Sequence, residues 1–122
     1  MTFLYVFLGG GLGSLARYAV GLMLPATDLR AGQLPWGTLT ANLLACILLG
    51  LGVALLGREL LSRSLQLLLL TGFCGGFSTF STYVLEIFTL AESGHWLAAG
   101  GYLLLSLLTG IVALATVYLL TR

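Results

Sequence analysis

Four long apolar stretches, each nearly free of charged residues, occupy most of this 122-residue chain. They cover about residues 3–24, 36–57, 65–91 and 97–120. A helix needs about 20 apolar residues to cross a hydrocarbon core roughly 30 Å thick, so each stretch is long enough to span a bilayer. The composition agrees, because 59% of the residues are hydrophobic and only 7% are charged. We therefore predict an all-α integral membrane protein with four transmembrane helices, forming a single transmembrane domain over residues 1–122.

Several other classes of protein fit poorly. The first stretch lacks a basic leader, is too long for the apolar part of a signal peptide and contains Arg17, so we expect a retained helix. Cys46 and Cys74 lie in apolar stretches without metal-ligand spacing and are read as packing residues. With a net charge of +1, the chain lacks the excess of basic residues that binding to nucleic acid requires. His95 stands apart from any nucleophile or metal ligand, so an enzyme is not indicated.

The arginines give only a weak signal for orientation in the membrane. With an even number of spans, Arg58, Arg63 and Arg122 lie on the side of the N-terminus, against Arg30 and, if it is counted, Arg17 on the other. So small a difference allows insertion both ways round, and with it an antiparallel dimer. The alternative is a single orientation set by one or two residues, and charge alone does not decide between them.

Polar residues inside the first two stretches are candidates for function. Gly9, Gly13, Arg17 and Gly21 recur every four residues, which places them on one helical stripe where another helix can approach closely. An arginine inside a membrane normally faces protein or water, so Arg17 belongs to an anion path or an ion pair unless it snorkels to the interface. Asn42 either hydrogen-bonds a neighbouring helix or presents its donors to a permeant species.

The third stretch contains a segment rich in glycine and hydroxyl residues. Gly75 and Gly76 each cost about 1 kcal/mol relative to alanine in a helix interior, and the hydroxyl residues that follow can compete for backbone hydrogen bonds. We expect the helix to break here in mid-membrane, where freed carbonyls are tolerated only inside protein or beside a cavity. The alternative is a straight helix packed through its glycines.

Aromatic and hydroxyl residues follow this segment and recur in the fourth stretch. Aromatic ring edges are positive and hydroxyls donate hydrogen bonds, so such residues can line an anion path, although they also serve as packing. Glu86 lies one turn further on. The residues in question are Phe80, Ser81, Thr82 and Tyr83, with Tyr102, Ser106 and Gly110 spaced four apart in the fourth stretch.

Three segments resemble the signatures of the Fluc or CrcB fluoride channels. They are GGLGSLARY at residues 10–18, GTLTANL at 37–43 and GFCGGFSTFSTY at 72–83, and they occur in the same order as in that family. The resemblance extends over nearly the whole chain. It implies a dual-topology, antiparallel homodimer in the cell membrane, with two fluoride pores and a central structural Na⁺.

The resemblance also implies roles for individual residues. The fluoride pore would be lined by Asn42, Phe80, Ser81, Thr82, Tyr83, Tyr102 and Ser106. Arg17 and Glu86 would lie in a vestibule, and the backbone carbonyls of Gly75 and Ser78 would hold the Na⁺. This sequence departs from the family at Tyr83, where phenylalanine is common, and at Gly110, where a further serine can occur.

The expected function is passive export of fluoride, with fluoride, sodium, the bilayer and a second copy of the chain as partners and no nucleic acid. Two other functions stay open. A small proton-coupled multidrug exporter would need a carboxylate in the first span, where this chain has Arg17. A non-transporting membrane scaffold would use the same glycines and hydroxyls only to pack helices.

Overall fold

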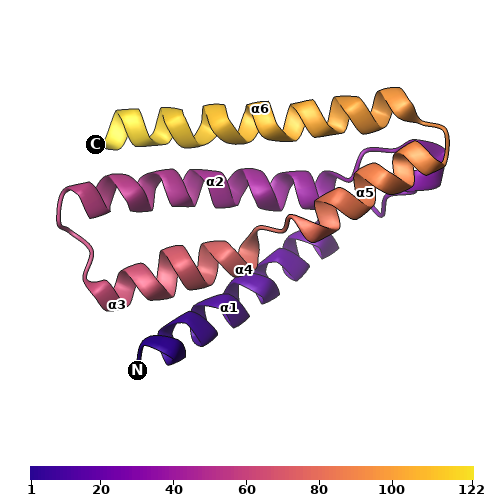
Figure 1. The fold of residues 1–122 in the computed structure, drawn as a ribbon. Helices are drawn as coiled ribbons and strands as arrows, with labels where there is room; N and C mark the ends of the chain where they lie inside the picture. The colour runs from indigo at the N-terminus through magenta and orange to yellow at the C-terminus, as the bar shows by residue number, and fades with distance from the viewer.

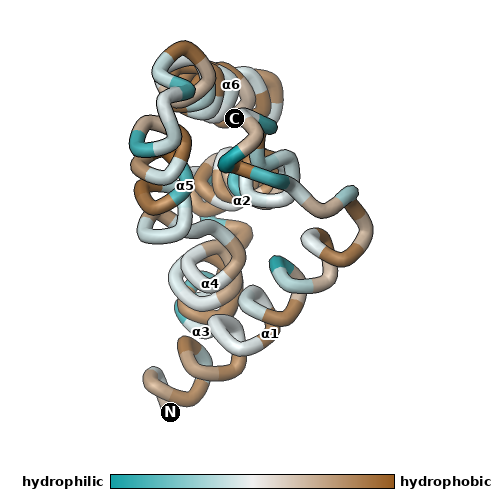
Figure 2. The backbone as a smooth tube through the Cα atoms, turned by 90° about the vertical axis from the view of Figure 1, so that its right-hand side faces the viewer, coloured by the Kyte–Doolittle hydropathy of each residue, from teal (hydrophilic) through white to brown (hydrophobic).

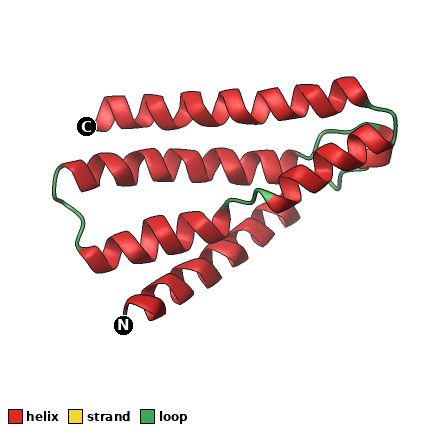
Figure 3. Cartoon of the chain, in the orientation of Figure 1, coloured by secondary structure: helices red, strands yellow, loops and turns green.

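The computed structural model describes residues 1–122 and consists of helices and connections without strands (Figure 3). Four helical segments are long and apolar enough to cross a membrane, which confirms the predicted all-helical fold with four such helices. They are α1 (Thr2–Met23), α2 (Trp36–Gly57), the segment Arg63–Glu92 and α6 (Trp96–Thr121). The third segment is composed of α3 (Arg63–Leu65), the π-helical η2 (Gln66–Cys74), α4 (Gly75–Phe77) and α5 (Ser81–Glu92).

The helices are arranged so that both chain termini lie at the same end of the molecule (Figure 1). The connection between α2 and α3 shares that end, and Arg58 Nη2 there donates a 3.1 Å hydrogen bond to the Arg122 carbonyl. The short 3₁₀ helix η1 (Leu29–Ala31) and the connection from α5 to α6 lie at the opposite end. His95 Nε2 lies 2.9 Å from the Arg30 carbonyl and so joins these two connections.

Helix α1 packs backbone to backbone against the first half of the third segment. A Cβ atom added to Gly9 would overlap the Leu68 carbonyl, and one added to Gly13 would overlap the Phe73 carbonyl. From the other side, a Cβ atom on Gly72 would lie 2.9 Å from the Cα of Gly9. Only glycine permits this approach, so the predicted close contact is confirmed at Gly9 and Gly13, whereas a Cβ atom on Gly21 would meet nothing within 4 Å.

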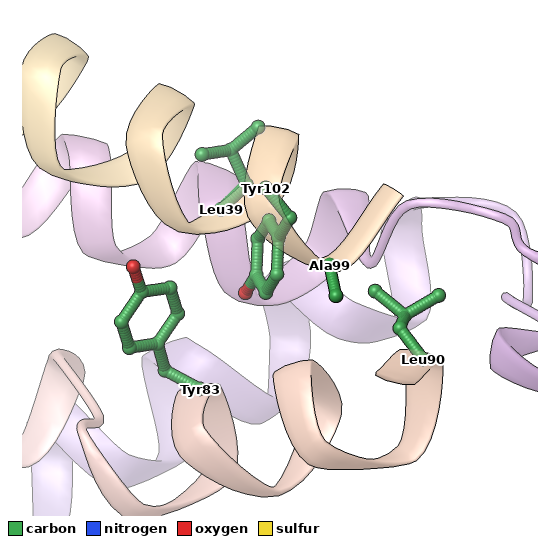
Figure 4. Packing of buried hydrophobic residues seen from close by; sticks show 5 residues of the cluster. All are labelled: Leu39, Tyr83, Leu90, Ala99 and Tyr102. Atoms are coloured by element: carbon green, nitrogen blue, oxygen red, sulfur yellow. The ribbon is translucent and has the colours of Figure 1, made fainter. Parts of the chain in front are cut away.

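The largest buried cluster joins α5 to α6 and α2. It consists of Leu39, Tyr83, Leu90, Ala99 and Tyr102, and Figure 4 shows the Tyr102 ring of α6 beside the Tyr83 ring of α5. The two rings meet edge to face, with centroids 5.2 Å apart and planes at 69°. Such contacts add about 0.5–1.5 kcal/mol beyond the burial of area.

Much of the remaining apolar surface is uncovered. Hydrophobic residues recur along every long helix (Figure 2), and Phe3 and Leu97 are 89% and 94% exposed. A water-soluble monomer does not expose apolar surface on this scale. Lipid and other protein chains are the surroundings that such a surface requires.

The position of Arg17 changes the balance of charge between the two ends. Its Nη1 lies 3.5 Å from the Ser78 carbonyl, in the interior of the segment Arg63–Glu92. Arg17 is therefore left out when the positive charges at the two ends of the molecule are compared. Arg58, Arg63 and Arg122 lie at the end of the termini, and Arg30 lies at the other end, which is a clearer difference than the sequence alone indicated.

Candidate functional site

The helical hydrogen-bond pattern of the third segment is interrupted at residues 78–80, between α4 and α5 (Figure 3). Ser78 has extended backbone angles, φ −76° and ψ 158°. Both glycines expected at the break, Gly75 and Gly76, belong to the helical α4 instead. A Cβ atom on Gly76 would overlap the Gly10 carbonyl, so this glycine is required for contact with α1.

Asn42 of α2 satisfies the backbone of Thr79 at this interruption. Thr79 N–H donates to Asn42 Oδ1 over 2.7 Å, and Asn42 Nδ2 donates to the Thr79 carbonyl over 3.1 Å. Because the backbone supplies one donor and one acceptor, the orientation of the amide follows from its partners. One of the two sequence interpretations, a hydrogen bond to a neighbouring helix, is therefore confirmed. The second N–H of the amide is not used in this pairing.

The carbonyls around the interruption are only partly paired. Ser78 donates to the Cys74 carbonyl through both N–H and Oγ, at 3.0 and 2.9 Å. The contact from Arg17 to the Ser78 carbonyl is long, at 3.5 Å, so it is a weak hydrogen bond. In a continuous α-helix the N–H of Thr79 would bond to the carbonyl of Gly75, and here that N–H is used by Asn42.

A pocket of about 240 Å³ opens beside the interruption. It is lined by Asn42, Cys46, Ser78, Thr79, Phe80, Tyr83, Ser106 and Leu107. The Phe80 side chain is 77% exposed, so the part of the pocket that it lines is not covered by other residues of the chain. Its ring centroid lies 6.3 Å from that of Tyr83.

Two hydroxyl groups at this pocket differ in their bonding. Tyr83 Oη donates to the Leu103 carbonyl of α6 over 2.9 Å, so the hydroxyl that distinguishes it from phenylalanine anchors α5 to α6. Ser106 Oγ is buried and has no hydrogen-bond partner within the chain. A buried hydroxyl without a partner is costly, and a ligand or water in the pocket would satisfy it.

Glu86 is held by two hydroxyl groups from different helices. Thr38 Oγ1 donates to Glu86 Oε1 over 2.6 Å, and Tyr102 Oη donates to Oε2 over 2.7 Å. Tyr102 is completely buried. The carboxylate thus ties α5 to both α2 and α6 next to the rings of the pocket.

A second cavity of about 280 Å³ has no hydrophobic side chain in its lining. It is formed by Arg17, Gly21, Gly37, Thr38, Thr79 and Thr82. A third cavity, of about 200 Å³, shares Gly21, Gly37 and Thr38 with it and reaches Glu86. Arg17 therefore lines the second cavity and Glu86 the third, and neither residue lines the first pocket.

The structure brings most of the residues predicted for the site together. Asn42, Phe80, Tyr83 and Ser106 line the first pocket, and Thr82 lines the second. Tyr102 meets Tyr83 and Glu86 behind the first pocket. Ser81 is exposed at the start of α5 and lines none of these three cavities.

Among the lining residues that were not predicted for the site, Cys46 and Thr79 bear most on its chemistry. Cys46 follows Asn42 by one helical turn and so shares its face of α2, a spacing that the sequence already contains. Thr79 contributes through its backbone as well as by lining both cavities. No property of a threonine side chain in a sequence marks such a backbone role.

Comparison with known proteins gives a consistent result. Residues 4–118 match the family model described as CrcB-like protein, Camphor Resistance (CrcB). A protein of Chlorobium chlorochromatii named Fluoride-specific ion channel FluC is 46% identical over 113 residues, covering 91% of this chain and 84% of the relative. A protein of the same name from Gloeothece citriformis is 38% identical over 123 residues, covering 100% of this chain and 98% of the relative. A third, from Leptospira interrogans, is 41% identical over 111 residues, covering 90% and 86%.

The match to residues 4–118 includes every residue that lines the first pocket and the two further cavities. This chain belongs to the CrcB-like family.

Proposed function

We propose that this chain is the subunit of a fluoride channel, not an enzyme, and that it releases fluoride passively across the cell membrane. The observation that carries the proposal is the pocket of Asn42, Phe80, Tyr83 and Ser106, where an unpaired buried hydroxyl and a free amide N–H face aromatic rings. The names of the relatives, Fluoride-specific ion channel FluC, support fluoride as the ion.

The chemistry of this pocket suits a small, strongly hydrated anion. Hydrogen-bond donors replace lost water molecules, while the positive edges of aromatic rings offer a weak attraction that does not trap the ion. An inside-negative potential of 100 mV drives a univalent anion outward with about 2.3 kcal/mol, so no other energy source is required. Arg17, in the second polar cavity, would raise the local concentration of anions at the pocket.

The functional unit in this proposal is an antiparallel homodimer with two pores, in which the interruption of the third helix lies at mid-membrane. Phe80 supports this arrangement, because its exposed ring leaves the pocket without a complete wall in a single chain. A second copy in the opposite orientation would supply that wall. The single transmembrane domain of residues 1–122 is then half of the working channel.

A structural Na⁺ at the centre of the dimer is also part of the proposal. The backbone carbonyl oxygens of Gly75 and Ser78 would bind the Na⁺, because a hard cation prefers oxygen ligands. Gly75 is exposed and its carbonyl lacks the Thr79 partner of a continuous helix, which fits the role. The Ser78 carbonyl has only a long contact to Arg17, and a carbonyl oxygen has two lone pairs. Replacing Na⁺ by N-methyl-D-glucamine should lower the thermal stability of the purified dimer, and K⁺ should restore it less well than Na⁺.

The main experiment is efflux of fluoride from liposomes that contain the purified protein, with chloride efflux as the comparison. The variant Phe80→Ile keeps an apolar side chain but removes the ring. We expect rapid fluoride release with negligible chloride release from the wild type, and loss of fluoride release from the variant. Folded protein that releases neither ion would contradict the channel and favour a scaffold, and uptake of organic cations against a proton gradient would favour a drug exporter.

A further inference from the structure

The polar stripe on α6 has a gap after Ser106. Tyr102, Ser106 and Gly110 follow one another at intervals of four residues, so they lie along one face of the helix. The hydroxyl of Tyr102 is used by Glu86, and that of Ser106 is unpaired. Gly110 is buried and has no side chain to offer.

The thiol of Cys46 lies at the place that a side chain of residue 110 would enter. A Cβ atom added to Gly110 would lie 3.2 Å from Cys46 Sγ, and apart from the chain neighbours and nearby backbone of α6 no other heavy atom would lie within 4 Å of it. Cys46 is on α2, which packs along α6. It also lines the pocket of Asn42 and Ser106, and it is not in a disulfide.

We propose that the Cys46 thiol is a permeation residue of this channel, donating its S–H to the anion at the position where the stripe on α6 lacks a hydroxyl. The proposal rests on the proposed function as a fluoride channel. It gives the thiol a role in conduction beyond the packing role that the sequence indicated. The donors along the pocket are then Asn42 Nδ2, Ser106 Oγ and Cys46 Sγ, from two facing helices.

A thiol is a weaker donor than a hydroxyl, which distinguishes this role from mere filling of space. Serine and alanine are both smaller than cysteine, so a packing role predicts similar losses for Cys46→Ser and Cys46→Ala. A donor role predicts that Cys46→Ser keeps conduction and that Cys46→Ala loses it. It further predicts that a hydroxyl introduced from the other helix, in Cys46→Ala with Gly110→Ser, restores conduction.

The test compares fluoride efflux from liposomes for the wild type, the two single variants and the double variant, each checked as a folded dimer by size-exclusion chromatography. We expect Cys46→Ser within about twofold of the wild type and Cys46→Ala slower by about three- to tenfold, the range for one weak hydrogen bond to an ion. The double variant should recover most of the lost rate. Cys74→Ala is the matched control, because the Cys74 side chain lines a separate, apolar cavity with Leu69 and Leu70, and its efflux should be unchanged.

A thiol reagent provides a second measurement. Methyl methanethiosulfonate applied to Cys74→Ala should slow fluoride efflux, whereas the same treatment of Cys46→Ser with Cys74→Ala should have no effect. Equal rates for Cys46→Ala and Cys46→Ser would overturn the proposal while leaving the channel function standing. Failure of the wild type to release fluoride would instead overturn the channel function and the proposal together.

Discussion

The side-chain amide of Asn42 pairs with both the N–H and the carbonyl of Thr79, so that one residue of α2 replaces two backbone partners where the third helix is interrupted. Such a pairing means that the side chain holds the shape of the site as well as lining it. Structure and conduction should therefore fail together when it is removed.

Asn42→Ala should lower both stability and fluoride efflux. The change leaves two buried backbone groups of Thr79 without partners, at a cost of about 1–3 kcal/mol for each group. Thermal unfolding in detergent and efflux from liposomes would measure the two effects. Thr40→Ala, on the same helix and outside the three cavities described above, serves as the control. An Asn42→Ala protein with wild-type stability would contradict the structural role.

Tyr83→Phe should lose little conduction. The ring and its contact with Tyr102 remain, and only the hydrogen bond to the Leu103 carbonyl is removed. We expect a loss of about 1 kcal/mol in stability and fluoride efflux near that of the wild type. Tyr83→Leu, which removes the ring as well, should reduce efflux strongly. If both variants behaved alike, the ring would have no role of its own.

The stabilising effect of the Tyr102 hydroxyl should depend on Glu86. The hydroxyls of Thr38 and Tyr102 donate to different oxygens of the same carboxylate, so Tyr102→Phe should cost about 1–3 kcal/mol in the wild type and less in a Glu86→Gln background. A double-mutant cycle on thermal stability measures this coupling. Additive losses would mean that the Tyr102 hydroxyl acts independently of the carboxylate.

Gly9→Ala and Gly11→Ala should have opposite effects. A Cβ atom on Gly9 would overlap the Leu68 carbonyl, which should destabilise the fold by about 1–3 kcal/mol or more. A Cβ atom on Gly11 meets nothing within 4 Å, so alanine there should stabilise the helix by up to about 1 kcal/mol. Thermal unfolding of the two variants side by side would show whether α1 needs its backbone contact.

The arginines at the end of the termini should influence orientation. We expect both orientations in cells, with an excess of chains whose termini face the cytoplasm, because Arg58 and Arg63 lie at that end and Arg17 lies inside the membrane segment. Arg58→Gln with Arg63→Gln should shift the ratio toward the other orientation. Labelling of single cysteines placed in the connections of a cysteine-free chain would measure the ratio. Detection of one orientation alone would contradict a homodimer of opposed chains.

The helices could be predicted from the sequence because the bilayer demands long apolar stretches, and such stretches are visible without a structure. The glycine stripe of α1 was also predictable, since close helix contacts in membranes require small residues at fixed spacing. The location of the interruption was harder. The helix propensity of Gly75 and Gly76 pointed to those residues, but both are helical, Gly76 packs against the Gly10 carbonyl, and the extended residue is Ser78.

The remaining features of the site depend on contacts between distant residues. The partners of Glu86 come from α2 and α6, and neither hydroxyl is close to it in sequence. The π-helical stretch η2, at Gln66–Cys74, is not marked by any pattern among its leucines. The spacing of Cys46 from Asn42 places the two residues on one face of α2, but the sequence does not show that this face lines a cavity, so a single thiol in an apolar stretch indicates packing.

The exposed ring of Phe80 has a consequence for how activity depends on the amount of protein in a membrane. In the proposed homodimer, this pocket is complete only after two chains have met in the plane of the bilayer, so mass action would govern it. Diluting the protein into increasing amounts of lipid should eventually lower the rate of fluoride release per chain, whereas this rate would stay constant if single chains conducted. The lipid-to-protein ratio at which this happens measures how tightly the chains associate.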